Sequence, residues 1–151
     1  MLRQASTVIL LLAAVGCAEP NAESTEPQDW SALVEEANEV LLNQGQLDRV
    51  GEFFTESYGG GQGPDMIREF VSDLRTAFPD LRVEVEVLLS GEDRVAWIRR
   101  HRGTHQGDFM GVPATGRELT WQSMTVSRME DGLIAEEWGA SELLGALRTP
   151  E

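Results

Sequence analysis

Apolar positions recur with two different periods along this chain, first at helical spacing and later at strand spacing. From residue 30 to residue 41 they return every three or four positions, which predicts an amphipathic helix with one buried face. Asp29 is placed to cap the start of this helix, and Gly45 is placed to end it. A shorter helix is predicted over 47–54, and a third begins at Pro64, a residue that suits the first helical turn.

Beyond Pro79, which ends the third helix, the apolar period changes to that of a strand. Apolar and charged residues alternate from Leu81 to Val87, as they do in a strand with one buried face. Three further strands are predicted over 94–107, 117–130 and 133–139, with a tight hairpin at 131–132 and a short helix over 141–147. We therefore predict an α+β fold. Its N-terminal helices pack on a curved, mostly antiparallel sheet of four or more strands and leave a cone-shaped cavity.

The N-terminal segment has the pattern of an export signal. A positive residue, Arg3, precedes an apolar run over 8–15, which is shorter than the roughly 20 residues that a membrane span needs. The sequence Ala-Val-Gly-Cys at 14–17 resembles a bacterial lipobox, so we expect cleavage to leave Cys17 as a lipidated first residue. The alternative is an ordinary signal peptide in which this cysteine is incidental.

These features divide the chain into a signal peptide with a lipobox over 1–17, a tether over 18–28 and one domain over 29–151. The tether contains two prolines and no apolar period, which is typical of a solvated segment. The expected localisation is the cell envelope, with the chain anchored to a membrane through Cys17 and its domain outside the cytoplasm.

The charge balance excludes several classes of function. The formal net charge is −14, and removal of the signal takes away one basic residue, Arg3, to leave −15. Such an acidic domain repels phosphate backbones and anionic lipid surfaces, so nucleic acid is not an expected partner. All twelve basic residues are arginine. Without lysine, neither Schiff-base chemistry nor a Walker-type phosphate loop is available.

No metal site is expected. Cys17 is the only cysteine, which rules out a disulfide within the chain and a Cys-rich zinc site. The only two histidines, His101 and His105, lie on one predicted strand with their Cα atoms about 13 Å apart, too far to share one ion. Arginines at positions 99, 100 and 102 surround His101, and we interpret this histidine as a surface residue of the strand.

Four segments resemble those of one known family in their order and spacing. They are AFPDL at 77–81, GTHQGDFMGVPATGR at 103–117, RMEDGLI at 128–134 and EEWGASELLGAL at 136–147. Together they resemble the SnoaL-like polyketide cyclases, or ester cyclases, of the nuclear transport factor 2-like superfamily. The resemblance implies a reaction without a cofactor on a small carbonyl compound. A proton next to a carbonyl is abstracted, and an intramolecular aldol reaction then closes a ring.

The resemblance also implies catalytic residues. His105 stands at the position of the family's pocket histidine, where a neutral imidazole can polarise or position a substrate oxygen. Its alternative role is to tether the loop that follows it. Glu142 stands where the family has the aspartate that acts as the general base, and Glu137 replaces a family histidine. The alternative for Glu142 is a solvated surface position.

Aromatic and charged residues complete the expected substrate-binding set. They are Tyr58, Trp97, Arg99, Phe109, Trp121, Glu137 and Trp138. The alternative for the aromatic members is a purely structural place in the core. Alternation puts Glu136 and Trp138 on one face of their strand and Glu137 on the other. After Tyr58 the chain reads GGGQG in place of the family's polar turn with His and Asp, which indicates a mobile lid or a plain connector.

Three functions remain open at this point. The first is a cyclase of the polyketide type, in which Glu142 is the base and His105 positions the substrate oxygen. The second is a non-catalytic envelope lipoprotein that binds a hydrophobic small molecule in the same cavity. The third is an assembly domain that forms a homodimer through its sheet face.

Overall fold

The computed structural model describes residues 29–149, so the expectations for the signal peptide, Cys17 and the tether lie outside the described residues. One antiparallel sheet has the order β1 (Arg82–Ser90), β2 (Arg94–Thr104), β3 (Glu118–Glu130) and β4 (Leu133–Ser141). The helical elements are α1 (Ser31–Ala37), η1 (Asn38–Asn43), η2 (Leu47–Glu52), α2 (Tyr58–Gly61), α3 (Gly63–Ala77) and α4 (Leu143–Arg148). The predicted α+β fold is confirmed. Among these helices, none has the length and apolar character needed to cross a membrane.

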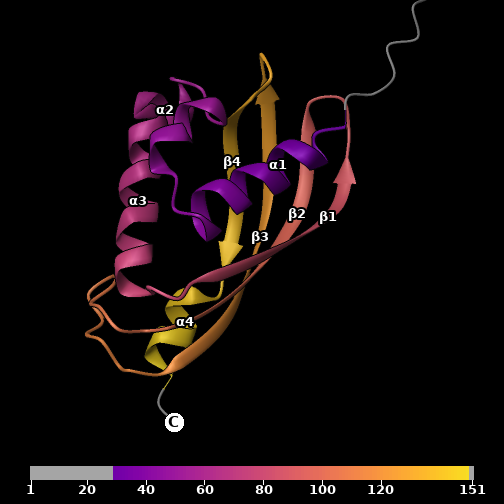
Figure 1. Ribbon diagram of the computed structural model, residues 1–151. Coiled ribbons are helices and arrows are strands. Elements are labelled where there is room, and N and C mark those ends of the chain that lie inside the picture. The colour runs from indigo at the N-terminus through magenta and orange to yellow at the C-terminus, as the bar shows by residue number, and fades with distance from the viewer. Residues whose placement is uncertain (1–28, 150–151) are drawn as a thin grey trace, which may run out of the picture.

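The N-terminal helices lie on one side of a curved, unclosed sheet (Figure 1). α1 crosses the strands, and α4 lies at the end of the sheet where β4 finishes. Two apolar clusters lie between the layers. One surrounds Trp97 and the residues of α1 and η1, and the other surrounds Phe78 at the end of α3. We call the helix-covered side the inner face and the opposite side the outer face.

The end of the first helical segment is fixed to the edge of the sheet by a side chain. Asn43 Oδ1 accepts the backbone N–H of Val83 at 2.8 Å, and Asn43 Nδ2 donates to the carbonyl of Val83 at 3.0 Å. Because β1 is an edge strand, these bonds satisfy backbone groups that have no strand beside them. The buried stripe of α1 and η1 is thereby held over the inner face.

The second strand ends at Thr104, three residues before the predicted Gly107. The backbone N–H groups of Gln106 and Gly107 donate to the carbonyl of Ala77, at 2.8 and 3.2 Å, and leave the strand ladder. A Cβ atom at Gly107 would lie 3.1 Å from the Cα of Ala77, so the close approach of the end of α3 favours glycine here.

The GGGQG segment forms a tight turn between Tyr58 and α3. Gly59 and Gly60 have φ angles of +61° and +75°, a left-handed conformation that glycine adopts at little cost. Tyr58 is buried at the start of this turn, and its side chain reaches Glu137 on the sheet.

Candidate functional site

The candidate site is built on the inner face of the sheet. Alternation along β2 places Trp97, Arg99 and His101 on this face. Ser127 of β3 and Glu137 of β4 are direct partners in the strand register and face the same side.

The main cavity lies between the helices and this face and has a volume of about 280 Å³. Its walls are mostly apolar, and its polar lining residues are Asn38, Tyr58, Arg99 and Glu137. A side hollow of about 200 Å³ adjoins it and is lined partly by His101 and Trp121. The two spaces share Phe70, Arg99 and Glu137, which therefore form the boundary between them.

The carboxylate of Glu137 is held by two hydroxyl donors. Tyr58 donates to Oε2 at 2.9 Å, and Ser127 donates to Oε1 at 2.8 Å. Trp97 Nε1 donates in turn to Ser127 Oγ at 2.9 Å, which extends the chain of hydrogen bonds along the cavity wall. Each carboxylate oxygen has a further lone pair, so Glu137 can still accept a proton from a ligand.

Tyr58 acts here as a hydrogen-bond donor only. Its ring is buried and makes an edge-to-face contact with Phe54, with ring centroids 5.0 Å apart. Burial raises the pKa of Tyr58 well above its usual value, and the negative charge of Glu137 raises it further. The phenol therefore stays protonated at physiological pH.

Arg99 brings a positive charge to the same cavity, and its hydrogen-bond donors are not all satisfied by the described residues. Its guanidinium carbon lies 4.6 Å from the centroid of the Trp97 ring, a cation–π contact. Its Nε is buried and has no hydrogen-bond partner within residues 29–149, where the ion pairs found do not include Arg99. Burial lowers the pKa of Arg99, and the charge of Glu137 opposes this shift.

His101 is a core residue, and its interpretation as a surface residue is wrong. Only 5% of it is exposed, and its ring stacks on Trp121 with centroids 4.6 Å apart and planes 8° apart. Its Nδ1–H donates to the carbonyl of Trp121 at 3.3 Å. Burial lowers the pKa of His101 to about 3, with a further contribution from the charge of Arg99, so the ring is neutral. The charged neighbours of His101 did not indicate its exposure, because successive residues of a strand point to opposite faces.

His105 and Phe109 lie beneath the loop that follows β2, outside the lining of both spaces. His105 is fully buried, stacks on Phe78 with centroids 5.1 Å apart, and its Nδ1 lies 3.2 Å from Thr115 Oγ1. Phe109 contacts the same Phe78 ring, at 6.3 Å between centroids. The geometry corresponds to the loop-tethering alternative for His105 and the core alternative for Phe109.

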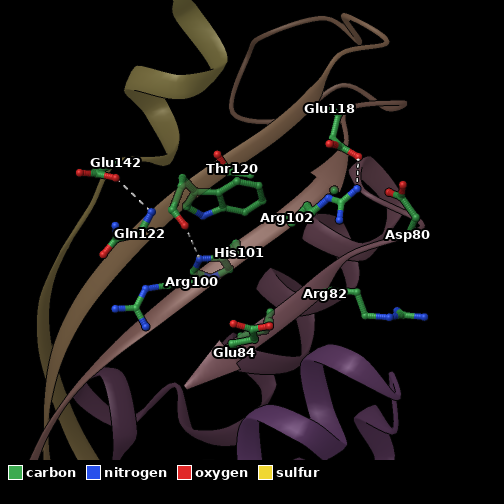
Figure 2. Close-up of a pocket in the computed structure, with 13 residues that line it drawn as sticks. Asp80, Arg82, Glu84, Arg100, His101, Arg102, Glu118, Thr120, Gln122 and Glu142 are labelled. Carbon is green, nitrogen blue, oxygen red and sulfur yellow. Dashed lines mark hydrogen bonds and ion pairs between the residues drawn. The ribbon is translucent and has the colours of Figure 1, made fainter. Parts of the chain in front are cut away.

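Glu142 and Trp138 lie on the outer side of the sheet. Figure 2 shows Glu142 beside an open groove, where Oε2 accepts the backbone N–H of Gln122 at 3.1 Å. The expectation that Glu142 points into the cavity is wrong, because β4 ends at Ser141 and this residue lies in the exposed turn into α4. Trp138 is 51% exposed, because it follows Glu137 on the strand and its side chain points to the opposite face of the sheet.

The outer groove has the larger volume, about 830 Å³, but its charged groups face solvent or one another. Arg102 pairs with Glu118 at 2.8 Å (Figure 2). Arg100, on the same strand, pairs with Glu86 at 2.6 Å. Exposed pairs of this kind contribute little. We therefore take the main cavity as the candidate site.

Sequence reasoning missed two polar residues of the site. Ser127 gave no signal, because a serine on a strand is common. Asn38 did give one, since it interrupts the apolar helical stripe between Ala37 and Leu41. It is buried, donates from Nδ2 to the carbonyl of Val34 at 2.7 Å, and its Oδ1 has no partner within the described residues.

The site combines a carboxylate that can act as a base with a phenol and a guanidinium that can donate hydrogen bonds. Within residues 29–149, no group of three or more His, Cys, Asp or Glu is arranged to hold a metal ion. Residues 32–149 match the family described as SnoaL-like polyketide cyclase. This chain belongs to that family.

Named relatives and a solved structure agree with this membership. The chain is 28% identical over 118 residues to an aklanonic acid methyl ester cyclase of Streptomyces sp. strain C5, which covers 70% of this chain and 72% of the relative. It is 26% identical to a nogalonic acid methyl ester cyclase of Streptomyces nogalater, over 71% of this chain and 87% of the relative.

The fold is similar to that of a SnoaL-like polyketide cyclase from Agrobacterium tumefaciens. The TM-score is 0.67 at 23% identity, over 78% of this chain and 94% of that one. The resemblance to the SnoaL-like polyketide cyclases, made from four sequence segments, is thereby confirmed at the level of family and fold.

Proposed function

We propose that this SnoaL-like protein removes a proton from a carbon next to a carbonyl group and closes a ring by an intramolecular aldol reaction, without a cofactor. The observation that carries the proposal is Glu137, the one carboxylate among the lining residues of the main cavity. The relatives are named as cyclases of two methyl esters, which supports a small carbonyl-containing substrate.

In the proposed reaction Glu137 takes the proton, and the electrons of the broken C–H bond form an enolate. The enolate carbon attacks a second carbonyl carbon of the same molecule and forms the new C–C bond. The oxygen of that carbonyl then receives the proton from Glu137, which restores the carboxylate. The product is an isomer of the substrate, so no oxidant or second reactant is consumed. Tyr58 and Ser127 orient the carboxylate throughout.

The proposal is tested with a simple ketone. Exchange of the α-hydrogens of 2-tetralone in D₂O is followed by NMR with the wild type and with Glu137→Gln. Loss of the base should lower the protein-dependent exchange rate at least 100-fold while the fold is kept. Glu136→Gln is the matched control, because this neighbour lies on the outer face and pairs with Arg128 at 3.1 Å.

The same assay tests the assignment made from the resemblance that gives Glu142 the role of the base. Under our proposal Glu142→Gln keeps exchange within about threefold of the wild type, since its carboxylate is exposed. A 100-fold loss in Glu142→Gln, together with normal exchange in Glu137→Gln, would move the base to Glu142 and refute the proposal.

A non-catalytic role in binding a hydrophobic small molecule is the second candidate. The apolar walls of the main cavity and the export-type N-terminus favour it. A small molecule that co-purifies with the protein, is identified by mass spectrometry and is not converted would support this candidate. Under either function, we propose an envelope lipoprotein that is anchored through Cys17.

A further inference from the structure

We infer that Arg99 is the anion-binding group of the main cavity, so that the site holds a planar oxyanion, an enolate or a phenolate, more tightly than the neutral form of the same ligand. The inference deepens the proposed function and rests on it in one respect, because the enolate that Glu137 would generate is such an oxyanion.

The first argument is that the charge of Arg99 lacks a hydrogen-bonded counterion. A buried cation is costly unless it is paired. Burial lowers the pKa of Arg99 and the charge of Glu137 raises it, yet the two oxygens of this carboxylate are bound by the hydroxyls of Tyr58 and Ser127. Within residues 29–149 the buried Nε of Arg99 has no hydrogen-bond partner and none of the ion pairs includes Arg99, so the protein itself leaves the guanidinium without a bound counterion.

The second argument is the conservation of charge during the proposed proton transfer. The titratable groups that line the two spaces are Tyr58, Arg99, His101 and Glu137. Tyr58 and His101 are neutral, so the cavity starts with one positive and one negative charge. When Glu137 takes the proton, the negative charge moves to the ligand oxygen, and Arg99 is the one cation there to receive it.

The third argument is geometric. Arg99 lies at the boundary of the main cavity and the side hollow, where a ligand in either space would meet it. The Trp97 ring supports the guanidinium face, so its orientation is set before a ligand binds. A planar guanidinium with parallel N–H donors suits a planar oxyanion better than a neutral carbonyl.

The experiment uses 2-naphthol, which is planar, is apolar apart from its hydroxyl group and changes its absorbance when it ionises. Glu137→Gln serves as the parent protein, because its neutral amide mimics the protonated base. We expect the pKa of bound naphthol to fall by at least one unit from its value in solution, which is a tenfold preference for the naphtholate. In the wild type the fall should be smaller, because ionised Glu137 repels the anion.

Two further variants assign the preference to Arg99. Glu137→Gln/Arg99→Met should still bind neutral naphthol but lose the preference for the anion. Glu137→Gln/Arg100→Met is the matched control and should behave like Glu137→Gln, since Arg100 is the next residue on the strand, is exposed and pairs with Glu86.

The inference is overturned if Glu137→Gln raises or leaves unchanged the pKa of bound naphthol, or if the Arg99→Met double variant keeps the naphtholate preference. Should the double variant not fold, the direction of the naphthol pKa change in Glu137→Gln alone still decides. A clear naphtholate preference together with no tetralone exchange in the wild type would support Arg99 and refute the catalytic proposal.

Discussion

His101 illustrates how a charge in the wall of the cavity acts on a neighbouring residue. It lies two positions after Arg99 on the inner face of β2, so both side chains contribute to the same enclosed space. Burial and the nearby guanidinium both disfavour a second positive charge, and the pKa of His101 falls to about 3. The stacked His101–Trp121 pair is therefore a neutral wall, and Arg99 keeps its role as the single cation of the site.

This pKa predicts a pH dependence of stability. Between pH 3 and pH 6.5 the unfolded chain binds one proton more at His101 than the folded chain, so the free energy of unfolding falls as the pH is lowered through this window. The slope for one proton is at most about 1.4 kcal/mol per pH unit. His101→Phe, which keeps a stacked ring, should flatten the curve by this amount in urea unfolding experiments from pH 4 to pH 7. A folded-state midpoint near 6.5 for His101 by NMR would contradict the prediction.

At the scale of elements, an irregularity between β3 and β4 determines the wall of the cavity. The register shifts between Arg128 and Met129, and on β4 both Ile134 and Ala135 are buried in succession. Ile134 and Glu137 are three residues apart and would face opposite sides of a regular strand. With the extra residue of the bulge between them, both line the main cavity. The position of the proposed base thus depends on a local break in pairing.

The same strand gives a prediction about packing. A Cβ atom at Gly139 would overlap the carbonyl oxygen of Met124, so Gly139→Ala must push β4 away from β3. We expect the free energy of unfolding to fall by about 1–3 kcal/mol, as for other overpacked sites. Gly145→Ala in α4 is the matched control, because no atom lies within 4 Å of its added Cβ. It should leave stability unchanged or raise it by up to about 1 kcal/mol. Equal stabilities of the two variants in urea would contradict the steric argument.

At the scale of the whole molecule, residues from both the helices and the sheet line the main cavity among the described residues, from Ala37 to Glu137. The export and anchoring that we propose involve the segment before residue 29, which lies outside the described residues. The homodimer through the sheet face stays a prediction. Met124 and Trp138 are exposed on the outer face, where such contact would form.

The anchoring gives a prediction of its own. We expect the wild type, expressed in a bacterial host and labelled with radioactive palmitate, to carry the label and to sediment with membranes. Cys17→Ser removes the only thiol that the lipid can join, so this variant should carry no label and leave the membrane fraction. Glu19→Gln, two residues along the tether, is the control and should be labelled like the wild type. An unlabelled wild-type protein would favour the alternative of an ordinary signal peptide.

The sequence by itself determined the elements, their order and the family. These properties are local, because the change from helical to strand period and the residues that begin and end helices act over a few positions. The four motif segments were sufficient for the family because each occupies one short stretch of chain. Alternation also showed correctly that Glu137 and Trp138 lie on opposite faces.

Only the tertiary structure decided which of these residues enclose the cavity. It brought Tyr58, Trp97, Arg99 and Glu137 together from segments far apart in the chain and left Glu142 in the exposed turn. Alternation shows which residues share a face, but not which face the helices will cover. Nor does it show where a bulge will reverse the alternation. Both depend on packing between distant segments, and this packing turned Glu137 inward, buried His101 and placed His105 beneath its own loop.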